Sequence, residues 1–171
     1  MYPVLFQLGP LSIRSWGVLV ILAFFVGTRV AAAEARRKGL EPDLVHDFSL
    51  WGLLGGVAGA HLYEVLLLDP AWYGRHPVQI LTRWQGGMAL CGALLGGTVA
   101  AILFTRRRRI GFWRFADVLA PGLILGQAFG RLGSFLDGEA YGVPTTLPWG
   151  VTYSDPNGLA PPHVQLHPVQ V

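Results

Sequence analysis

The sequence predicts an all-α integral membrane protein, a polytopic helical bundle with about four transmembrane helices. Of its 171 residues, 52% are hydrophobic and only 13% are charged, whereas charged residues make up about 25% of a typical soluble domain. The apolar residues form long blocks without the polar stripe of a soluble amphipathic helix. Arginine clusters border two of these blocks. Together, these features indicate that lipid surrounds most of the chain.

Four apolar blocks are predicted to enter or cross the membrane. Residues 15–33 and 48–68 are each long enough to cross about 30 Å of hydrocarbon. Residues 88–105 contain no charged side chain. Residues 115–129 form a shorter block that holds Pro121, so a kinked or oblique helix is expected there.

The orientation of the helices is predicted from the basic clusters. EARRKG follows the first block and TRRRR follows the third, and the positive-inside rule places both clusters on the cytoplasmic side. The N-terminus is therefore expected outside, as are the segments 68–87 and 130–142. Two arginines in the first of these segments oppose the assignment, but four consecutive arginines outweigh them. The first block lacks a preceding basic stretch and a small-residue cleavage site, so a removable signal peptide is not expected.

Glycines repeat at a spacing of four in three of the blocks. A small residue at every fourth position gives one helix face a smooth stripe, which lets two backbones approach closely in a membrane. The spacing therefore predicts tight helix packing. The glycines concerned are Gly55 and Gly59, Gly92 and Gly96, and Gly122, Gly126 and Gly130.

His61 and Glu64 interrupt the second block and lie three residues apart, which places them on one helix face. Because exposing either charge to lipid costs about 3 kcal/mol, both are expected to face the interior of the bundle. Two interpretations stay open. The residues either form a structural hydrogen bond between helices or line a polar cavity that is reached from outside.

The segment GRLGSFLDGEAYG, residues 130–142, places Arg131, Asp137 and Glu139 directly behind an apolar run. An arginine at the end of a span can extend to the lipid headgroups. Alternatively, the surrounding glycines allow the backbone to turn close to a ligand, and the guanidinium fork suits a phosphate ester. At that depth the expected anion is a phospholipid headgroup.

The remaining reactive side chains indicate no metal site, cofactor or nucleic-acid interface. Cys91 lies among small and apolar residues in MALCGALLG and is expected to be a packing residue rather than a catalytic base. His163 and His167 lie in a proline-rich segment and are expected to form a solvated turn rather than ligate a metal. The arginines lie beside apolar runs, which suits a membrane surface better than nucleic acid.

Five segments in order resemble the prolipoprotein diacylglyceryl transferase family, and the resemblance runs from about residue 5 to residue 171. In that family a Gly-Arg-x-Gly-Asn-Phe stretch is followed by Asn-x-Glu and a glycine, which GRLGSFLDGEAYG resembles. The other segments are weaker matches when each is taken alone. They are RSWGVLV, GAHLYEVL, WQGGMALCGALLG and HVQLHPVQV.

The resemblance implies a multi-pass enzyme of the bacterial inner membrane that needs no cofactor. It would move the diacylglyceryl group of phosphatidylglycerol onto the lipobox cysteine thiol in the signal peptide of a preprolipoprotein. By resemblance, Arg131 and Glu139 are catalytic, Arg131 binding the phosphate and Glu139 orienting that arginine or the headgroup. The resemblance also implies a set of substrate-binding residues, namely Arg131, Ser134, Asp137, Gly142, His61 and Trp16.

The sequence departs from the family pattern at several of these positions. Cys91 stands where relatives often have a histidine that is proposed as the base. Ser134 and Asp137 replace asparagines, Trp16 stands where a tyrosine is usual, and His61 where an arginine is usual. Each change alters the number of hydrogen-bond donors or the charge.

Residues 1–171 are expected to form a single transmembrane domain that corresponds to the N-terminal part of the family's domain. Relatives continue for about three more spans, with a second phosphate-binding arginine. Three alternatives therefore stay open beside the transferase. In these alternatives the chain is a fragment, a shortened paralogue that binds phospholipid without transfer, or a small transporter subunit. The glycine stripes with His61 and Glu64 would also suit a transporter.

Overall fold

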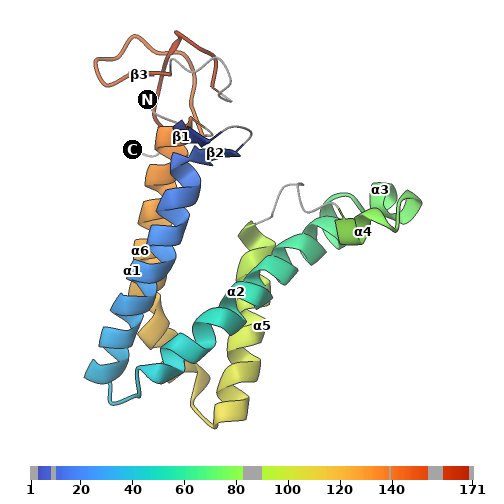
Figure 1. Ribbon diagram of the computed structural model, residues 1–171, viewed down its shortest axis with the longest axis vertical. Coiled ribbons are helices and arrows are strands. Elements are labelled where there is room, and N and C mark those ends of the chain that lie inside the picture. The colour runs from blue at the N-terminus through green and yellow to red at the C-terminus, as the bar shows by residue number, and fades with distance from the viewer. Residues whose placement is uncertain (1–3, 9–10, 83–89, 139, 154–159, 170–171) are drawn as a thin grey trace. The chain divides into compact units, whose positions relative to one another are not determined.

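The structure is a computed structural model that describes residues 4–8, 11–82, 90–138, 140–153 and 160–169. As predicted, it is mainly helical (Figure 1). The four long helices are α1 (Ser15–Arg37), α2 (Asp43–Tyr63), α5 (Leu90–Arg108) and α6 (Phe112–Asp137). Between α2 and α5 lie the π-helix η1 (Glu64–Leu68) and the short helices α3 (Pro70–Arg75) and α4 (Gln79–Thr82).

Three helical stretches of the described chain are long and apolar enough to span a membrane: Ser15–Arg37, Asp43–Leu68 and Leu90–Arg108. They correspond to the first three predicted blocks. With 26 residues α6 is also long enough, since a helix rises about 1.5 Å per residue. Its charged residues make it less apolar, so the fourth crossing stays a prediction. These residues are Arg114, Asp117, Arg131 and Asp137.

The chain forms two compact units, one of Met1–Val30 with Pro121–Val171 and the other of Ala31–Ala120. Both boundaries fall inside long helices, and the boundary in α6 falls at Pro121. Helix α6 continues through Pro121, so the predicted block 115–129 is the middle of a longer element. Each unit is described separately below.

In the unit Ala31–Ala120, α2 and α5 pack side by side (Figure 1). Their contact is made by glycine backbones. A Cβ on Gly55 would lie 2.9 Å from the carbonyl oxygen of Gly96, and a Cβ on Gly59 would overlap the carbonyl oxygen of Gly92. The prediction that these four glycines form a close helix contact is confirmed.

An aromatic cluster forms the core of the same unit. The ring centroids of Phe48 and Phe104 lie 5.4 Å apart, and that of Phe115 lies 5.2 Å from Phe48. Phe115 is 1% exposed, and Ala31 and Ala35 at the end of α1 pack into the same cluster. The end of α1, the start of α2, the end of α5 and the start of α6 therefore share one core.

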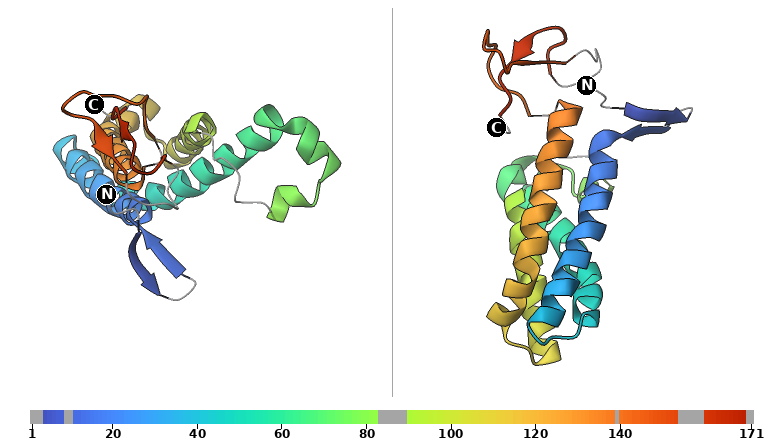
Figure 2. Two further views of the ribbon diagram at one scale, coloured as in Figure 1. Left: turned by 90° about the horizontal axis from the view of Figure 1, so that it is seen from above. Right: turned by 90° about the vertical axis from the view of Figure 1, so that its left-hand side faces the viewer.

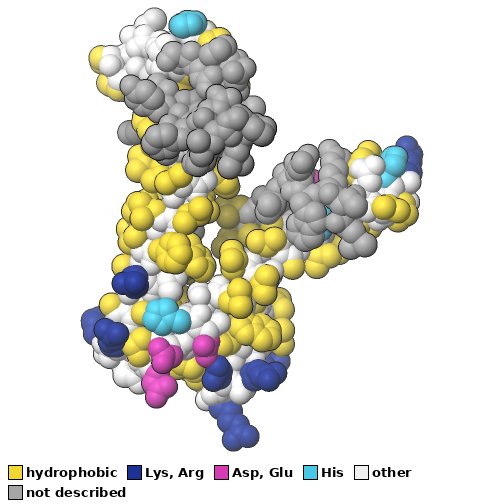
Figure 3. Space-filling model, viewed as in Figure 1, with side chains coloured by type: hydrophobic (Ala, Val, Ile, Leu, Met, Phe, Trp, Pro, Cys, Tyr) yellow, Lys and Arg dark blue, Asp and Glu magenta, His cyan; other side chains and the backbone are white. Residues whose placement is uncertain are grey.

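Charged residues surround this core where the helices end. Arg108 of α5 forms an ion pair with Asp47 of α2, and Arg114 of α6 donates a hydrogen bond of 2.9 Å to the carbonyl oxygen of Lys38. In Figure 3 many lysine, arginine, aspartate and glutamate side chains gather at this end of the unit, and hydrophobic side chains cover much of the helices next to it. The two predicted basic clusters thus lie in one charged region, and their assignment to the cytoplasmic side stays a prediction.

In the other unit, α1 and α6 pack in antiparallel directions. A Cβ on Gly27 would lie 2.9 Å from the carbonyl oxygen of Gly122, and a Cβ on Gly133 would lie 3.2 Å from Cδ1 of Trp16. The start of α1 therefore lies against the end of α6. The prediction of a stripe through Gly126 and Gly130 is wrong, since both face open space.

The geometry of the α-helix explains that difference. At about 100° per residue, a step of four positions moves the stripe by about 40° around the helix. Gly122 and Gly133 are eleven residues apart and return to within about 20° of the same face. Helix α1 therefore packs along the face of α6 that carries Gly122 and Gly133. Glycines at every fourth position do not stay on that face.

Two small antiparallel hairpins add to the predicted all-helical fold. Strands β1 (Val4–Leu8) and β2 (Leu11–Arg14) pair directly before α1, as Figure 2 shows. Strands β3 (Val151–Thr152) and β4 (Gln165–Leu166) pair in the C-terminal segment. Around β3 and β4 lies a small core of buried residues, which are Tyr153, Ala160 and Leu166.

Candidate functional site

The segment that resembles the family signature begins as a helix. Residues expected in an outer loop form the last two turns of α6, which ends at Asp137. Gly138 then adopts a φ of 70°, in the left-handed region that glycine enters readily and that commonly terminates helices. Glu139, the second predicted catalytic residue, lies outside the described residues.

Arg131 is exposed and forms no hydrogen bond or ion pair with any residue that the structure describes. It lies two residues before Gly133, which packs against Trp16 of α1. Two residues correspond to about 200° around a helix, so Arg131 extends from the face of α6 opposite α1. From this face the guanidinium can present two parallel N–H groups to an anion.

Ser134 and Trp16 belong to the same unit as Arg131. Ser134 follows Arg131 by three residues and is half-buried, and residues at this spacing are neighbours on a helix surface. Trp16, in the first turn of α1, is 42% exposed. Its Cα and Cδ1 atoms line the position where Gly133 meets α1, so it supports α6 from the side opposite Arg131.

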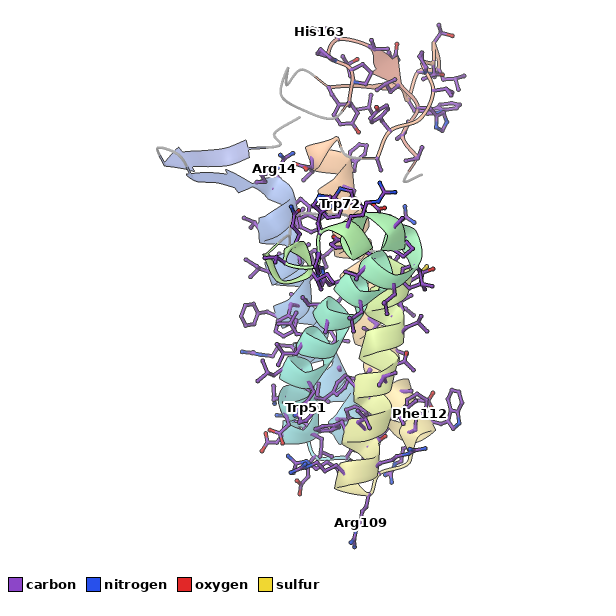
Figure 4. The ribbon with its side chains drawn as sticks, turned by 90° about the vertical axis from the view of Figure 1, so that its right-hand side faces the viewer. Arg14, Trp51, Trp72, Arg109, Phe112 and His163 are labelled. Atoms are coloured by element: carbon purple, nitrogen blue, oxygen red, sulfur yellow. The ribbon has the colours of Figure 1, made fainter. Side chains whose placement is uncertain are left out.

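Asp137 is held by an arginine that the sequence analysis did not single out. Its side chain is 7% exposed, and Arg14 donates from Nε to Oδ1 at 3.1 Å and from Nη2 to Oδ2 at 2.9 Å. Figure 4 labels Arg14 where β2 meets α1, beside the end of α6. Both carboxylate oxygens are engaged, so the geometry supports a role for Asp137 in holding Arg14.

The positions of Asp137 and Arg14 at the helix ends explain why an ion pair between them is favourable. Asp137 ends α6, where the helix dipole disfavours an anion, and Arg14 precedes α1, where it disfavours a cation. Because the helices are antiparallel, each charge also lies beside the end of the neighbouring helix that favours it. The pair therefore removes an unfavourable interaction that either residue alone would have.

Gly142 packs against the C-terminal segment. Its N–H donates a hydrogen bond of 2.9 Å to the carbonyl oxygen of His167, and a Cβ at position 142 would lie 2.7 Å from the same oxygen. Only glycine fits without a shift of the backbone. The contact accounts for Gly142 as a structural residue of this segment.

His167 is half-buried and hydrogen-bonded, in contrast to the expected solvated turn. The indole Nε1–H of Trp149 donates to Nε2 of His167 at 3.2 Å, and Nδ1 lies 3.0 Å from the carbonyl oxygen of Pro168. Since an indole can only donate, Nε2 accepts and Nδ1 carries the proton. His163 is exposed with a φ of 61°. No group of three or more potential metal ligands occurs among the described residues.

His61 belongs to the other unit, Ala31–Ala120. It is 8% exposed, as predicted for a residue that faces away from lipid, and its Nε2 lies 2.7 Å from the carbonyl oxygen of Ile80 in α4. Its ring packs edge-on against Tyr73 of α3 at 6.3 Å. Glu64 is half-buried at the start of η1. These contacts fit the structural interpretation of His61.

Cys91 is exposed in the first turn of α5, and the prediction that it is a packing residue is wrong. Gly92 and Gly96 make the contact with α2 instead. A neighbouring position points about 100° away around the helix. The side chain of Cys91 therefore projects from the side of the helix pair.

Comparisons with known proteins agree with the resemblance in the sequence. A model of the family "Prolipoprotein diacylglyceryl transferase" matches residues 3–171. The phosphatidylglycerol–prolipoprotein diacylglyceryl transferase of Trichormus variabilis is 45% identical over 149 residues, which cover 86% of this chain and 52% of that protein. The proteins of the same name from Synechococcus elongatus and Symbiobacterium thermophilum are 45% and 44% identical, over 86% and 83% of this chain and 50% and 53% of theirs.

The chain thus spans about half the length of the curated relatives it matches. The match extends over nearly the whole sequence, and the helices that are apolar enough to cross a membrane make the chain a multi-pass membrane protein. On this evidence, the chain belongs to the prolipoprotein diacylglyceryl transferase family.

Proposed function

We propose that this chain transfers the diacylglyceryl group of phosphatidylglycerol to the lipobox cysteine thiol of preprolipoproteins, in the bacterial inner membrane. The names of its relatives support the reaction, since they specify phosphatidylglycerol and prolipoproteins. The observation that carries the proposal is Arg131, an exposed arginine in the signature segment at the end of an apolar helix. Residues 1–171 would act as a single transmembrane domain, because one family model matches residues 3–171.

The reaction sets three tasks for the protein. The cysteine sulfur attacks the glycerol carbon that carries the phosphate ester, a C–S bond forms, and the C–O bond breaks. Glycerol phosphate leaves with the bonding electrons, and the thiol proton passes to a base. The protein must therefore align sulfur and carbon, accept the proton and stabilise the departing phosphate.

Arg131 is suited to the third task. Its planar guanidinium can form two parallel hydrogen bonds to phosphate oxygens, and such charged bonds are roughly twice as strong as neutral ones. Ser134 follows by three residues on the helix surface and would add a hydroxyl donor to the phosphate or the glycerol. We assign Glu139 to orienting Arg131 or the headgroup, on the basis of its match to the motif glutamate.

Four further residues were implied as substrate-binding by resemblance. Asp137 pairs with Arg14, and Gly142 packs against His167. His61 is bonded to Ile80. Trp16 packs at Gly133. These contacts support structural roles for the four residues, with any contact to substrate as an additional role.

A second candidate function is binding of phosphatidylglycerol without transfer. It is favoured by Cys91, which stands where relatives often have the histidine proposed as the base and which projects from the side of its helix pair. The transporter alternative receives less support, because Nε2 of His61 already contacts a backbone carbonyl in its own unit.

A transfer assay distinguishes these functions. The purified chain in detergent is incubated with labelled phosphatidylglycerol and a lipobox peptide, and the lipidated peptide is followed by mass. The controls are a peptide with serine in place of the cysteine, an Arg131→Gln variant and a full-length relative. Transfer that requires Arg131 supports the proposed reaction. Binding of the labelled lipid without transfer supports the second candidate. If the chain neither transfers nor binds the lipid while the full-length relative is active, both candidate functions are excluded.

A further inference from the structure

We propose that Arg14 is a positioning residue: by holding Asp137, it sets the rotation of the last turns of α6 about the helix axis and thereby the direction of Arg131. The first part rests on contacts within one unit of the fold. The second part rests on the proposed function, because it assigns Arg131 to a phosphate.

The contacts of α6 with α1 differ in how well they resist rotation. Gly27 meets Gly122 through backbone atoms alone, and Gly133 meets side-chain and backbone atoms of Trp16. Glycine contacts determine how closely two helices approach, but α6 contributes no side chain to either contact that could interlock with α1 and resist turning. A bidentate pair is directional, because two N–H groups must meet two oxygens at once.

Asp137 is well placed to provide this resistance. It lies four residues after Gly133, about 40° away around the helix, and so on the face toward α1. Arg14 directly precedes α1, and the pairing of β2 with β1 holds its backbone in place. The pair thus connects the last residue of one helix to a hairpin-anchored residue at the start of the other.

Rotation of α6 has a large effect at Arg131. Side chains reach about 5–6 Å from a helix axis, so a rotation of 30° displaces their ends by about 3 Å. Hydrogen bonds depend on distances that vary by only a few tenths of an ångström. A rotation of this size would move the guanidinium away from a phosphate without unfolding the helix.

Loss of Arg14 provides the driving force for such a rotation. Asp137 is 7% exposed, and a carboxylate so buried that loses its partner gains by reaching water. Turning or fraying the last turns of α6 exposes it. The expected consequence is a changed direction of α6 side chains in a folded protein.

A disulfide reporter measures this direction independently of lipid binding. A Cβ on Gly133 would lie 3.6 Å from Cβ of Leu19, within the range of about 3.5–4.5 Å that disulfides require. The reporter is Leu19→Cys with Gly133→Cys in a Cys91→Ala background. Variants are compared only after size-exclusion chromatography and circular dichroism show that they are folded.

The reporter is combined with changes to the ion pair. Arg14→Gln and Asp137→Asn should each slow disulfide formation about tenfold, because the two Cβ atoms no longer stay in range. The exchange Arg14→Asp with Asp137→Arg should restore it, since each charge then lies at the favourable end of its own helix. Arg29→Gln is the matched control, because Arg29 is an exposed arginine of α1 without an ion pair to the described residues.

The same ion-pair variants, without the reporter cysteines, are titrated with short-chain phosphatidylglycerol, and phosphatidylcholine serves as the comparison lipid. Affinity should fall about tenfold in Arg14→Gln, as for outer partners that orient the ligands of metal sites. The exchange should recover affinity, and Arg29→Gln should leave it unchanged. If Arg14 stabilised the fold only through its size, the exchange of the two charges would not restore lipid affinity.

The outcomes separate the two parts of the proposal. Unchanged disulfide formation in Arg14→Gln overturns the positioning role. Slower disulfide formation with unchanged lipid affinity overturns the link to Arg131. If the parent chain does not bind phosphatidylglycerol, the proposed function fails, and the disulfide measurement alone decides the role of Arg14. Should Arg14→Gln fail to fold, Arg14→Lys replaces it, with the same expected slowing because the lysine cannot form the bidentate pair.

Discussion

Gly59 of α2 and Gly92 of α5 pack backbone to backbone, so that a Cβ on either glycine would overlap the carbonyl oxygen of the other. In a membrane, helices associate mainly through such close packing, because lipid offers apolar side chains the same environment as a neighbouring helix. The contact between these two glycines therefore determines how closely α2 and α5 approach.

Gly59→Ala should destabilise the chain by about 1–3 kcal/mol, because the added methyl group overpacks the contact and the helices must separate. Gly97→Ala is the matched control, since Gly97 lies in α5 and its Cβ position has no described atom within 4 Å apart from the nearby backbone of α5 itself. Unfolding in mixed detergent micelles measures both variants. Equal stability of the two variants would show that this contact is not close in the folded protein.

Tyr153→Phe should stabilise the C-terminal segment by about 1 kcal/mol. The phenol oxygen of Tyr153 is buried and has no hydrogen-bond partner among the residues that the structure describes, and a buried polar group without a partner costs about 1–3 kcal/mol. Thermal unfolding in detergent tests the change. A clear loss of stability would show that the hydroxyl has a partner in the folded protein.

The same residue predicts a dependence of stability on pH. Burial raises the pKa of Tyr153 above its ordinary value of 10.0, because the charged phenolate is poorly solvated. The folded state therefore holds its proton to higher pH than the unfolded state does. The contribution is fully present below pH 10 and is lost as the pH rises through the folded-state pKa. Stability should fall more steeply above pH 10 in the parent than in Tyr153→Phe, and parallel curves would contradict this.

Cys91→Ala should change stability by less than about 0.5 kcal/mol, as for a surface substitution, because the side chain is exposed and α5 contacts α2 through other residues. The variant should also bind phosphatidylglycerol as the parent does. Unfolding and lipid titration check the two statements. Transfer of diacylglyceryl groups that is abolished in Cys91→Ala would assign the thiol a catalytic role.

The orientation predicted from the arginine clusters can be tested with single cysteines in a Cys91→Ala background. A cysteine at Thr145, after the signature segment, should react with a membrane-impermeant thiol reagent in intact spheroplasts. A cysteine at Arg107 should react only after the membrane is opened. Both positions are outside the most apolar parts of the helices. The reverse pattern would overturn the orientation.

The sequence was sufficient to predict the features that depend on local pattern. The apolar blocks correspond to α1, α2 and α5, and the glycine spacing identified the contact of Gly59 with Gly92. The hairpin of β1 and β2 was missed, although the dipeptide Gly9-Pro10 between the two strands is a sequence signal for a turn. The strong membrane signal of the following block drew the interpretation toward helices.

The parts of the site that escaped prediction depend on contacts between distant residues. Arg14 and Asp137 are 123 positions apart, and no local pattern relates a residue before the first helix to one that ends the last. Arg131 was identified through its motif, but its direction depends on which face of α6 meets α1. That face is determined by Gly133 and Trp16. The repeat of glycines at every fourth position did not indicate it.

The most direct test of this account is the affinity of Arg131→Lys for phosphatidylglycerol, with Arg29→Lys as the matched control. If Arg131 binds the phosphate through its guanidinium fork, lysine keeps the charge but loses the bidentate geometry, and affinity should fall at least about tenfold. Arg29→Lys should bind as the parent does. Equal affinity in Arg131→Lys and the parent would contradict the account, because it would show that position 131 provides only a positive charge at the membrane surface.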